Sequence, residues 1–528
     1  MSAAGDTADA VVIGSGPNGL VAAITLARKG WAVTVIERDE HPGGAVRTEA
    51  LTAPGFLHDT FSGFYGLLHA SPVFDRLELG RRIEWAQFDT PVAAAVSPER
   101  AASIHRDPSR TIKELGADGE AWGELLAWWE KAGRRFFHLT LAPIGAIRPA
   151  LRFARAMGIR GALPTARRLI APISEVAADT FASEEARALL ASGITHSDVS
   201  AEAAGSTPFA LILAMLAQTS GMPVPVGGAG VITDALVAAL TDAGGVIRTG
   251  DAATRVAVAR GRALAVETAN GAVVRARHAV LADTGPLALC RDLVGEEHFP
   301  APFLDGLRRF RYGTGIFKMD IALDGITPWL LEQLRATGVV HVVGTVDDMA
   351  RAHFEAQHGA LPARPSLVVG QQTVADPSRA PAGKHTLWIE THVPAHPPGG
   401  WERAREPFSE RVFDLIEQHA PGFRDRIVGT AVHTPADLES RNPNLVGGDL
   451  GGGSAALHQQ LVFRPVPGWF RYRTPVKGLY LCSASTHPGG GVHGMSGLNA
   501  AKRALRDARR PAGVLRTAGS ARRAPRPA

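Results

Sequence analysis

Residues 10–44 read AVVIGSGPNGLVAAITLARKGWAVTVIERDEHPGG, and this stretch decides the fold of the chain. The short apolar run at 10–13 predicts a buried strand, 17–29 predicts a helix, and 31–36 predicts a second strand. The turn between the first strand and the helix has the spacing G-x-G-x-x-G, with Gly14, Gly16 and Gly19. A strand, a glycine turn and a helix in this order predict a Rossmann-type dinucleotide-binding unit.

The turn and the end of the second strand supply the expected cofactor contacts. Gly16 lets the backbone approach a diphosphate, and the helix that follows aims its first amides at the same group. Glu37 lies 18 residues after Gly19, where its carboxylate can accept two ribose hydroxyls and would repel the 2′-phosphate of NADP. The same pattern can form a strand–helix turn without a ligand. The expected binding residues of the turn are Gly14, Ser15, Gly16, Pro17, Asn18 and Gly19.

Length and charge set limits on the architecture and on the partners. A chain of 528 residues should contain more than one domain. The net charge is +5, and four of these charges lie at 511–528, a stretch rich in Ala, Pro and Arg that contains no acid. We expect this stretch to be a disordered basic tail. Because no aromatic residue accompanies its arginines, a solvated tail is favoured over a nucleic-acid-binding arm, and no nucleic-acid partner is expected.

The cysteines and the apolar runs bear on the compartment. Cys290 and Cys482 are the only cysteines and form no C-x-x-C motif, which excludes a disulfide scaffold and a thiol–disulfide redox site. The first apolar run is the first Rossmann strand rather than a signal peptide. No run reaches the roughly 18 apolar residues of a spanning helix, and the longest, 209–217, predicts a buried helix. A cytoplasmic location is expected.

The chain returns twice to the α/β pattern of its beginning. We therefore expect one dinucleotide-binding domain assembled from 1–71, 222–303 and 474–510, and a substrate domain formed by 72–221 and 304–473. The first part of the substrate domain is expected to be mostly helical. In the second part, apolar residues alternate with polar ones at 317–323, which predicts a half-buried strand in a sheet with one exposed face. The glycine-rich stretch 447–453 suggests only flexibility.

A basic amphipathic segment lies within the helical part. Residues 139–161 mix apolar side chains with Arg148, Arg152, Arg155 and Arg160. A helix of this kind can lie on an anionic membrane surface, or it can be an ordinary surface helix that covers the core. The pattern does not distinguish the two.

The last part of the chain contains a second strand, glycine loop and helix, at 479–483, 487–494 and 495–505. Gly489, Gly491 and Gly494 also have the G-x-G-x-x-G spacing. No βαβ unit follows, so a separate NAD site is less economical than a helix start that completes the first site.

Several of these motifs together resemble the phytoene desaturase family of FAD-dependent flavoproteins, which are related to amine oxidases. The branch most similar to this chain is that of pyridine nucleotide-disulfide oxidoreductase domain-containing protein 2. The resemblance covers nearly the whole chain except the tail. It rests on the following motifs: GSGPNG at 14–19, Glu37, PGG at 42–44, PGF at 54–56, PVGGAG at 225–230, Val256, NPNL at 442–445, GLYL at 478–481 and THPGGG at 486–491.

The resemblance implies the cofactor and further contacts to it. The cofactor would be FAD, and the fold an α/β fold with an amine-oxidase-like, Rossmann-type FAD-binding domain beside an α+β substrate domain. The family often has Arg directly after the glycine doublet, where this chain has Ala45, so Arg47 is expected to contact a phosphate instead. Val256 would contact the adenine end through its backbone. The remaining expected cofactor contacts are Arg38, Gly43, Gly44, Gly489, Gly490, Gly491 and Met495.

The resemblance also suggests a reaction class. The chain would be a FAD-dependent oxidoreductase that desaturates or dehydrogenates an apolar, carotenoid- or isoprenoid-like substrate. His58, Asp59 and His487 lie beside cofactor motifs and are the candidates for proton transfer, with His493 less favoured. Each of them can instead make a structural hydrogen bond. The alternatives are an isomerase or saturase, and a flavin-binding regulatory protein acting through partners. No metal site is expected. Oxygen or a quinone are the candidate electron acceptors, and the sequence leaves the oligomeric state open.

Overall fold

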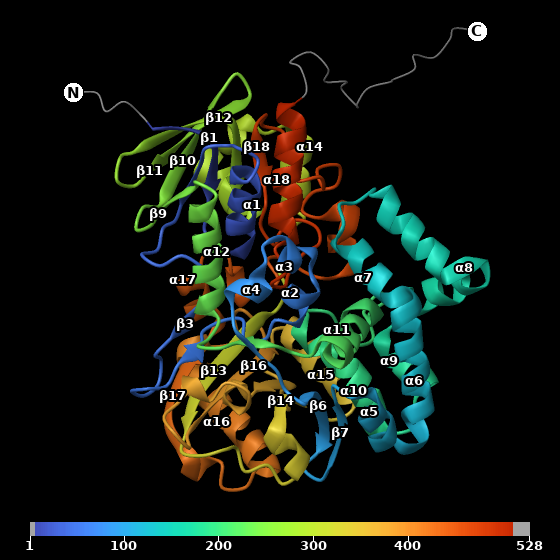
Figure 1. Cartoon of the computed structure of the whole chain (residues 1–528). Coiled ribbons are helices and arrows are strands. Elements are labelled where there is room, and N and C mark those ends of the chain that lie inside the picture. The colour runs from blue at the N-terminus through green and yellow to red at the C-terminus, as the bar shows by residue number, and fades with distance from the viewer. Residues whose placement is uncertain (1–5, 510–528) are drawn as a thin grey trace.

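The computed structural model describes residues 6–509, so the tail expected at 511–528 lies outside the described residues. Two seven-stranded sheets organise the described part. Figure 1 shows the first sheet, around β1 and β12, at the top of the view and the second, around β13 and β16, at the bottom. A group of helices lies to one side of the second sheet, with α8 at the outer edge.

The first sheet is a Rossmann-type sheet, as expected. Its parallel strands lie in the order β18–β12–β1–β2–β9, and β10 and β11 extend it as an antiparallel pair beside the start of β12. β1 is central, with Ala10, Val11 and Val12 fully buried, because both faces of a parallel sheet are covered. The strand bounds are β1 (Thr7–Ile13), β2 (Val33–Ile36), β9 (Val246–Arg248), β10 (Ala253–Ala259), β11 (Arg262–Thr268), β12 (Val273–Ala282) and β18 (Leu479–Leu481).

Helices cover the first sheet on both faces. Ala10, Val12 and Leu281 face a core shared with α1 (Pro17–Ala27), α12 (Gly230–Asp242) and α18 (Met495–Ala508). Val11 and Val280 face the opposite core, which includes residues of α13 (Pro286–Ala288) and α14 (Ala301–Leu307). The covering helices thus come from the two ends and the middle of the chain.

The second sheet is mixed, in the order β17–β13–β16–β15–β14–β6–β7, and only β14 and β6 are parallel. One of its faces packs on α16 (Trp401–His419). The bounds are β6 (Thr90–Ser97), β7 (Arg100–Ile104), β13 (Gly315–Leu323), β14 (Thr337–Val342), β15 (Leu367–Gly370), β16 (His385–Val393) and β17 (Ile427–His433).

The expected exposed face of the second sheet is wrong. All nine residues of β13 are buried, including Lys318 and Asp320. The alternation of apolar and polar residues is real, but the polar face packs against residues of the first part of the chain, including His58. The polar side chains therefore form an internal layer between the second sheet and the segment that contains β4, rather than a solvated surface.

The helical part differs from the expectation in two ways. β6 and β7 lie within 72–221 and belong to the second sheet. The sequence does not indicate β6 as a strand, because it contains three alanines and alanine is depleted in strands. The segment 139–161 is not one helix, because α7 ends at Leu141 and α8 begins at Ile147. The helices are α5 (Pro108–Glu114), α6 (Gly119–Trp128), α7 (Arg134–Leu141), α8 (Ile147–Ile170), α9 (Ile173–Thr180), α10 (Glu184–Ala191) and α11 (Thr207–Ser220).

The buried helix expected at 209–217 is confirmed, because it lies within α11 and packs in the core. Among residues 6–509 no helix is both long and apolar enough to cross a bilayer. The remaining elements are short, apart from the 12-residue α15. They are β3 (Thr48–Glu49), β4 (His58–Asp59), β5 (Trp85–Ala86), β8 (Val224–Pro225), α2 (Gly66–Ala70), α3 (Pro72–Arg76), α4 (Leu79–Arg82), α15 (Val346–Gln357) and α17 (Pro435–Arg441).

Candidate functional site

The glycine turn after β1 has the geometry that its sequence predicts. Gly14 has a φ of +89°, which favours glycine. A Cβ on Gly19 would collide with the carbonyl oxygen of Gly14, so this glycine allows α1 to pack tightly on the strand. Gly16 caps α1 and Pro17 is its first residue, which leaves the start of the helix open to a ligand.

Glu37 closes over the same turn. One oxygen of its carboxylate accepts hydrogen bonds from the backbone N–H (2.8 Å) and the hydroxyl (2.6 Å) of Ser15, and the other accepts from the N–H of Asp39 (2.9 Å). The carboxylate is therefore held at the end of β2 beside the glycine turn, where a ribose would lie next to the diphosphate. Arg38 is exposed and pairs with Asp39 (3.0 Å). Val256 lies on the edge strand β10 with its side chain buried.

Asp283 is a further residue of this turn that the sequence did not reveal. It directly follows β12, and its carboxylate accepts a hydrogen bond from the N–H of Gly19 (2.8 Å). Burial raises the pKa of Asp283 to about 7, against the effect of this hydrogen bond. The residue contacts Gly19 from 264 positions away in the chain, so no local pattern could have shown it. A carboxyl group that holds a proton near neutral pH can donate a hydrogen bond to a diphosphate oxygen.

The glycine doublet lies against the same turn. The N–H of Gly43 donates to the carbonyl oxygen of Ser15 (3.2 Å), and a Cβ on Gly44 would come within 3.1 Å of the Cα of Gly16. Arg47 pairs with Asp39 (2.9 Å), while its Nε is buried and has no hydrogen-bond partner. The doublet therefore encloses the turn, and Arg47 has a donor available beside it.

The closing loop, which we define as residues 487–494, reaches this first turn through α18. A Cβ on Gly497 would collide with the carbonyl oxygen of Asn18, and the N–H of Gly497 donates to the Asn18 side chain (3.4 Å). These residues are 479 positions apart in the chain. Because β18 pairs with β12, the second glycine motif is the last unit of the first sheet and not a separate nucleotide domain. Met495 begins α18 and is buried.

The glycine-rich stretch 447–453 supports the closing loop, although the sequence suggested only flexibility. A Cβ on Gly490 would come within 2.8 Å of the Cα of Gly451. Asp449 fixes the stretch by accepting hydrogen bonds from the N–H groups of Gly451 and Gly453. The fully buried guanidinium of Arg464 donates to the backbone carbonyls of Gly451 and of Ala484, three residues before the closing loop. Burial lowers the pKa of Arg464 to about 10.

His487 and His493 of the closing loop are both buried. The Nε2 of His487 donates to the carbonyl oxygen of Ala142 (2.9 Å), and its Nδ1 is buried without a hydrogen-bond partner. Burial lowers the pKa of His487 to about 4, so the ring is neutral at pH 7 and Nδ1 carries the lone pair. The Nδ1 of His493 accepts a hydrogen bond from the N–H of Met495 (3.1 Å).

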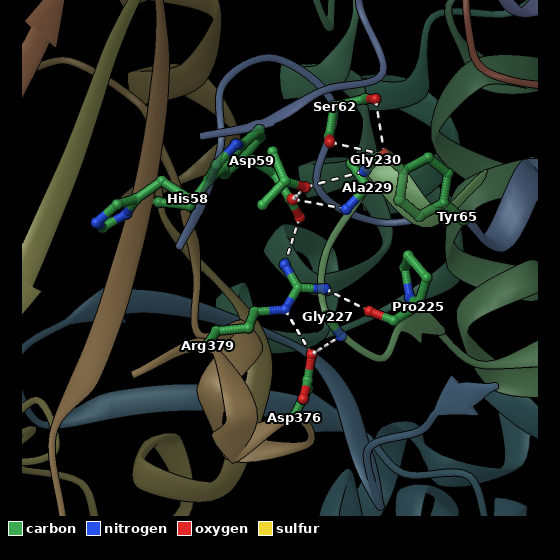
Figure 2. Close-up of polar contacts among 12 residues, drawn as sticks. His58, Asp59, Ser62, Tyr65, Pro225, Gly227, Ala229, Gly230, Asp376 and Arg379 are labelled. Carbon is green, nitrogen blue, oxygen red and sulfur yellow. Dashed lines mark hydrogen bonds and ion pairs between the residues drawn. The ribbon is translucent and has the colours of Figure 1, made fainter. Parts of the chain in front are cut away.

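His58 and Asp59 form β4, and Figure 2 shows that they point in different directions. Asp59 pairs with the buried Arg379 (2.5 Å) and accepts a hydrogen bond from the N–H of Ala229 (2.7 Å). Arg379 also pairs with Asp376 (2.8 Å) and donates to the carbonyl oxygen of Pro225 (2.8 Å). This network joins β4 to the PVGGAG segment, which is the structural role that the sequence left open for Asp59 (Figure 2).

His58 lies at a buried ionic cluster that sequence reasoning missed. Its Nδ1 is 3.8 Å from Asp320, which pairs with Lys318 (2.6 Å). Glu390 on β16 is directly opposite Lys318 on β13. Burial raises the pKa of Asp320 to about 6 and that of Glu390 to about 8, and Lys318 opposes both shifts. Burial, Lys318 and Arg379 lower the pKa of His58 to about 3. The cluster can therefore hold a proton near neutral pH.

The residues around the glycine turn fit a dinucleotide that contains a flavin. In the described part of the chain, polar atoms of the segments beside the turn and of the closing loop are buried without hydrogen-bond partners, among them Arg47 Nε, Thr284 Oγ1, His487 Nδ1 and His493 Nε2. Because residues 14, 16, 43 and 44 are glycines, no side chain at these positions covers the backbone of the turn. Within residues 6–509 no three His, Cys, Asp or Glu side chains are grouped to hold a metal, and both cysteines are buried and free.

Comparisons with known proteins agree with this geometry. Residues 12–76 match the family model described as an NAD(P)-binding Rossmann-like domain. The chain is 30% identical to pyridine nucleotide-disulfide oxidoreductase domain-containing protein 2 of Rattus norvegicus, over 94% of this chain and 93% of that protein. It is 25% identical to the phytoene desaturase (neurosporene-forming) of Cereibacter sphaeroides, over 94% of each chain.

The fold is also found among solved structures. Cyclohexylamine oxidase from Brevibacterium oxydans superposes with a TM-score of 0.55 at 15% identity, covering 95% of this chain and 98% of that chain. The amine-oxidase-like architecture is therefore confirmed, and the chain is an oxidoreductase of the flavin type. It belongs to the family of pyridine nucleotide-disulfide oxidoreductase domain-containing protein 2, a branch of the phytoene desaturase-like oxidoreductases.

Proposed function

We propose that the protein binds FAD and dehydrogenates an apolar, isoprenoid-like substrate. The observation that carries the proposal is the junction of α1 and α18, where Gly497 lies against Asn18. It brings two glycine-rich helix starts to one place, one suited to a diphosphate and the other to a reduced, negatively charged flavin ring. A protein that bound only NAD would need the first of these alone.

Residues of this chain would hold the cofactor along its length. Glu37 would accept the ribose hydroxyls, and the turn at 14–19 with Gly43 and Gly44 would enclose the diphosphate. Arg47, Arg38 and the backbone of Val256 would contact the adenosine half, and Gly489, Gly490, Gly491 and Met495 the flavin half. Bound flavin would supply the acceptor for a hydride from a substrate C–H bond.

Desaturation also requires that a proton leave the neighbouring carbon. His487 is the best-placed acceptor, since its Nδ1 is unprotonated at pH 7, buried and without a partner beside the closing loop. His58 is neutral as well, but Thr52 (2.7 Å) and Asp320 lie at its two ring nitrogens. Asp59 is occupied by Arg379 and Ala229. Oxygen or a quinone would reoxidise the flavin.

The apolar substrate is supported by what the relative from Cereibacter is named to act on, namely phytoene. A second candidate function is an isomerase or saturase, which must return a proton to carbon. The raised pKa values of Asp320 (about 6) and Glu390 (about 8) favour this alternative, because both groups can donate a proton near neutral pH. A regulatory flavin-binding protein would need neither the proton acceptor at His487 nor the ionic cluster of Lys318, Asp320 and Glu390.

Anaerobic mixing of flavin-loaded protein with candidate isoprenoid lipids tests the proposal. Bleaching of the oxidised flavin absorbance with formation of a new double bond supports dehydrogenation. Double-bond migration without net bleaching supports the isomerase. If no lipid, amine or alcohol bleaches the flavin and NAD(P)H does not reduce it, the proposed function is wrong.

A further inference from the structure

We propose that α8 and the cations around it form a docking surface for membranes that contain anionic lipid. The surface, which we call the α8 face, consists of the exposed side chains of α8 and the hollow between α8 and α7. It projects from the body of the protein at the right-hand edge of Figure 1. Three independent features of the face support the proposal.

The first feature is an exposed apolar stripe. Ile159, Leu163 and Ile170 are 97%, 82% and 61% exposed, and their spacing places them on one side of the helix. Gly158 divides α8 into two helical halves, and the first half carries two further exposed apolar side chains, Ile147 (72%) and Leu151 (48%). Single exposed apolar residues are ordinary, but a row of them on a projecting helix marks an interaction surface.

The second feature is charge. Residues 131–174 contain no Asp or Glu and nine cations: Lys131, Arg134, Arg135, Arg148, Arg152, Arg155, Arg160, Arg167 and Arg168. In the described part of the chain, none of the nine forms an ion pair. Basic side chains beside an apolar stripe suit an interface in which acyl chains adjoin anionic headgroups.

The third feature is a hollow of about 570 Å³ between α8 and the segment before α7. It is lined by Glu130, Lys131, Arg135, Arg152, Arg155 and Ala156. Four cations and one carboxylate thus surround an open space beside the first half of α8. A lipid phosphate has the charge and the hydrogen-bond acceptors to enter it.

A second copy of the chain is a poorer occupant than a lipid surface. A two-fold symmetric contact would place the same nine cations against each other with only Glu130 of the hollow to pair them. A membrane supplies both the apolar and the anionic complement.

The α8 face is connected to the candidate site. Ala142, in the loop between α7 and α8, accepts the hydrogen bond from His487 of the closing loop. Docking by α8 would bring the edge of the site to the lipid, where a water-insoluble substrate is dissolved. This last consequence rests on the proposed function; the docking surface itself does not.

Vesicle co-sedimentation of the full chain tests the proposal. The wild type should bind vesicles of phosphatidylcholine with 30% phosphatidylglycerol at least tenfold more tightly than phosphatidylcholine alone, and less tightly as salt rises. Arg152→Gln/Arg155→Gln should reduce the preference for anionic vesicles about tenfold. Ile159→Gln/Leu163→Gln should weaken binding to both. The matched controls are Arg351→Gln/Arg403→Gln and Val246→Gln, exposed residues elsewhere on the protein, which should bind like the wild type.

Three results would overturn the proposal. In the first, the wild type does not bind anionic vesicles. In the second, both α8 variants bind these vesicles as tightly as the wild type does. In the third, sedimentation velocity without lipid shows a dimer that Ile159→Gln/Leu163→Gln abolishes, which would mean that a second copy covers the stripe. All substituted side chains are solvent-exposed, so thermal unfolding of the variants should match the wild type and exclude misfolding as the cause. Because binding is measured without substrate, failure of the proposed function leaves this test intact.

Discussion

Arg379 donates a 2.5 Å hydrogen bond to Asp59 in the protein interior, although 320 positions separate the two residues in the chain. The guanidinium also pairs with Asp376 and is 1% exposed. One cation thus pairs with two buried carboxylates and joins three chain segments, 57–59, 225–229 and 376–379.

Replacing Arg379 by Met should lower the free energy of unfolding by about 3–5 kcal/mol, because two carboxylates remain buried without their partner. Urea unfolding followed by circular dichroism measures this. Arg424→Met, which breaks exposed pairs with Glu410 and Asp414, is the control and should cost at most about 1 kcal/mol. Equal stability of the two variants would exclude the structural role of the Asp59 network.

Gly497→Ala should reduce the flavin content of the purified protein strongly, since a Cβ there collides with the Asn18 carbonyl and pushes α18 away from α1. Absorbance of bound flavin and the thermal midpoint measure the two effects. Gly123→Ala is the matched control: its Cβ would meet only a methyl group of Ile112 at 3.6 Å, within helix α6. It should be stabilising by up to about 1 kcal/mol. Full flavin content in Gly497→Ala would refute a site shared by both helices.

His487→Gln should lower the rate of anaerobic flavin reduction by about 10²- to 10⁴-fold, because the amide can still donate to Ala142 but no longer offers the imidazole Nδ1 as a base. Stopped-flow absorbance with a substrate that bleaches the flavin measures this rate. The exposed His458→Gln is the control. Since the pKa of His487 is about 4, its protonation should not change the wild-type rate between pH 5 and 8. An unchanged rate with reduced stability would assign His487 a structural role.

Glu390 should make the protein less stable as pH rises. Burial raises its pKa from 4.5 to about 8, so between these values the folded state holds a proton that the unfolded state has released. Stability therefore falls with rising pH in this window, by up to about 1.4 kcal/mol per pH unit, and the effect ends above pH 8. Urea unfolding midpoints from pH 5 to 9, compared between the wild type and Glu390→Gln, measure the contribution of Glu390 to this pH dependence.

The control for this titration is Glu406→Gln on the exposed side of α16. The stability of this variant should depend on pH as that of the wild type does, whereas the stability of Glu390→Gln should not show the fall that is due to Glu390. Parallel curves for the wild type and Glu390→Gln would mean that Glu390 is already ionised in the folded protein.

Those parts of the fold and site that depend on local spacing could be predicted from the sequence. The glycine turn and the position of Glu37 are both set by neighbours in the chain, and the structure has each of them. The sequence also predicted that the closing loop completes the site of the first turn, because the second glycine motif is not followed by a βαβ unit of its own.

Residues that act through distant partners could not be predicted. Asp283 looks like an ordinary turn residue until β12 is placed beside β1. Lys318 and Asp320 alternate with apolar residues as a solvated strand would, and only packing against the segment that contains His58 makes their face internal. Arg464 is one arginine among many until its burial against 451–454 is known.

The contact between Asn18 and Gly497 also orders events during synthesis. The glycine turn is synthesised 479 positions before its partner Gly497 on α18. Until α18 is made, the apolar face of α1 that packs on it lacks this cover, and earlier neighbours such as α12 are the only part of this core that α1 can meet. The two glycine-rich helix starts can therefore come together only after α18 has been synthesised, however early the first of them folds.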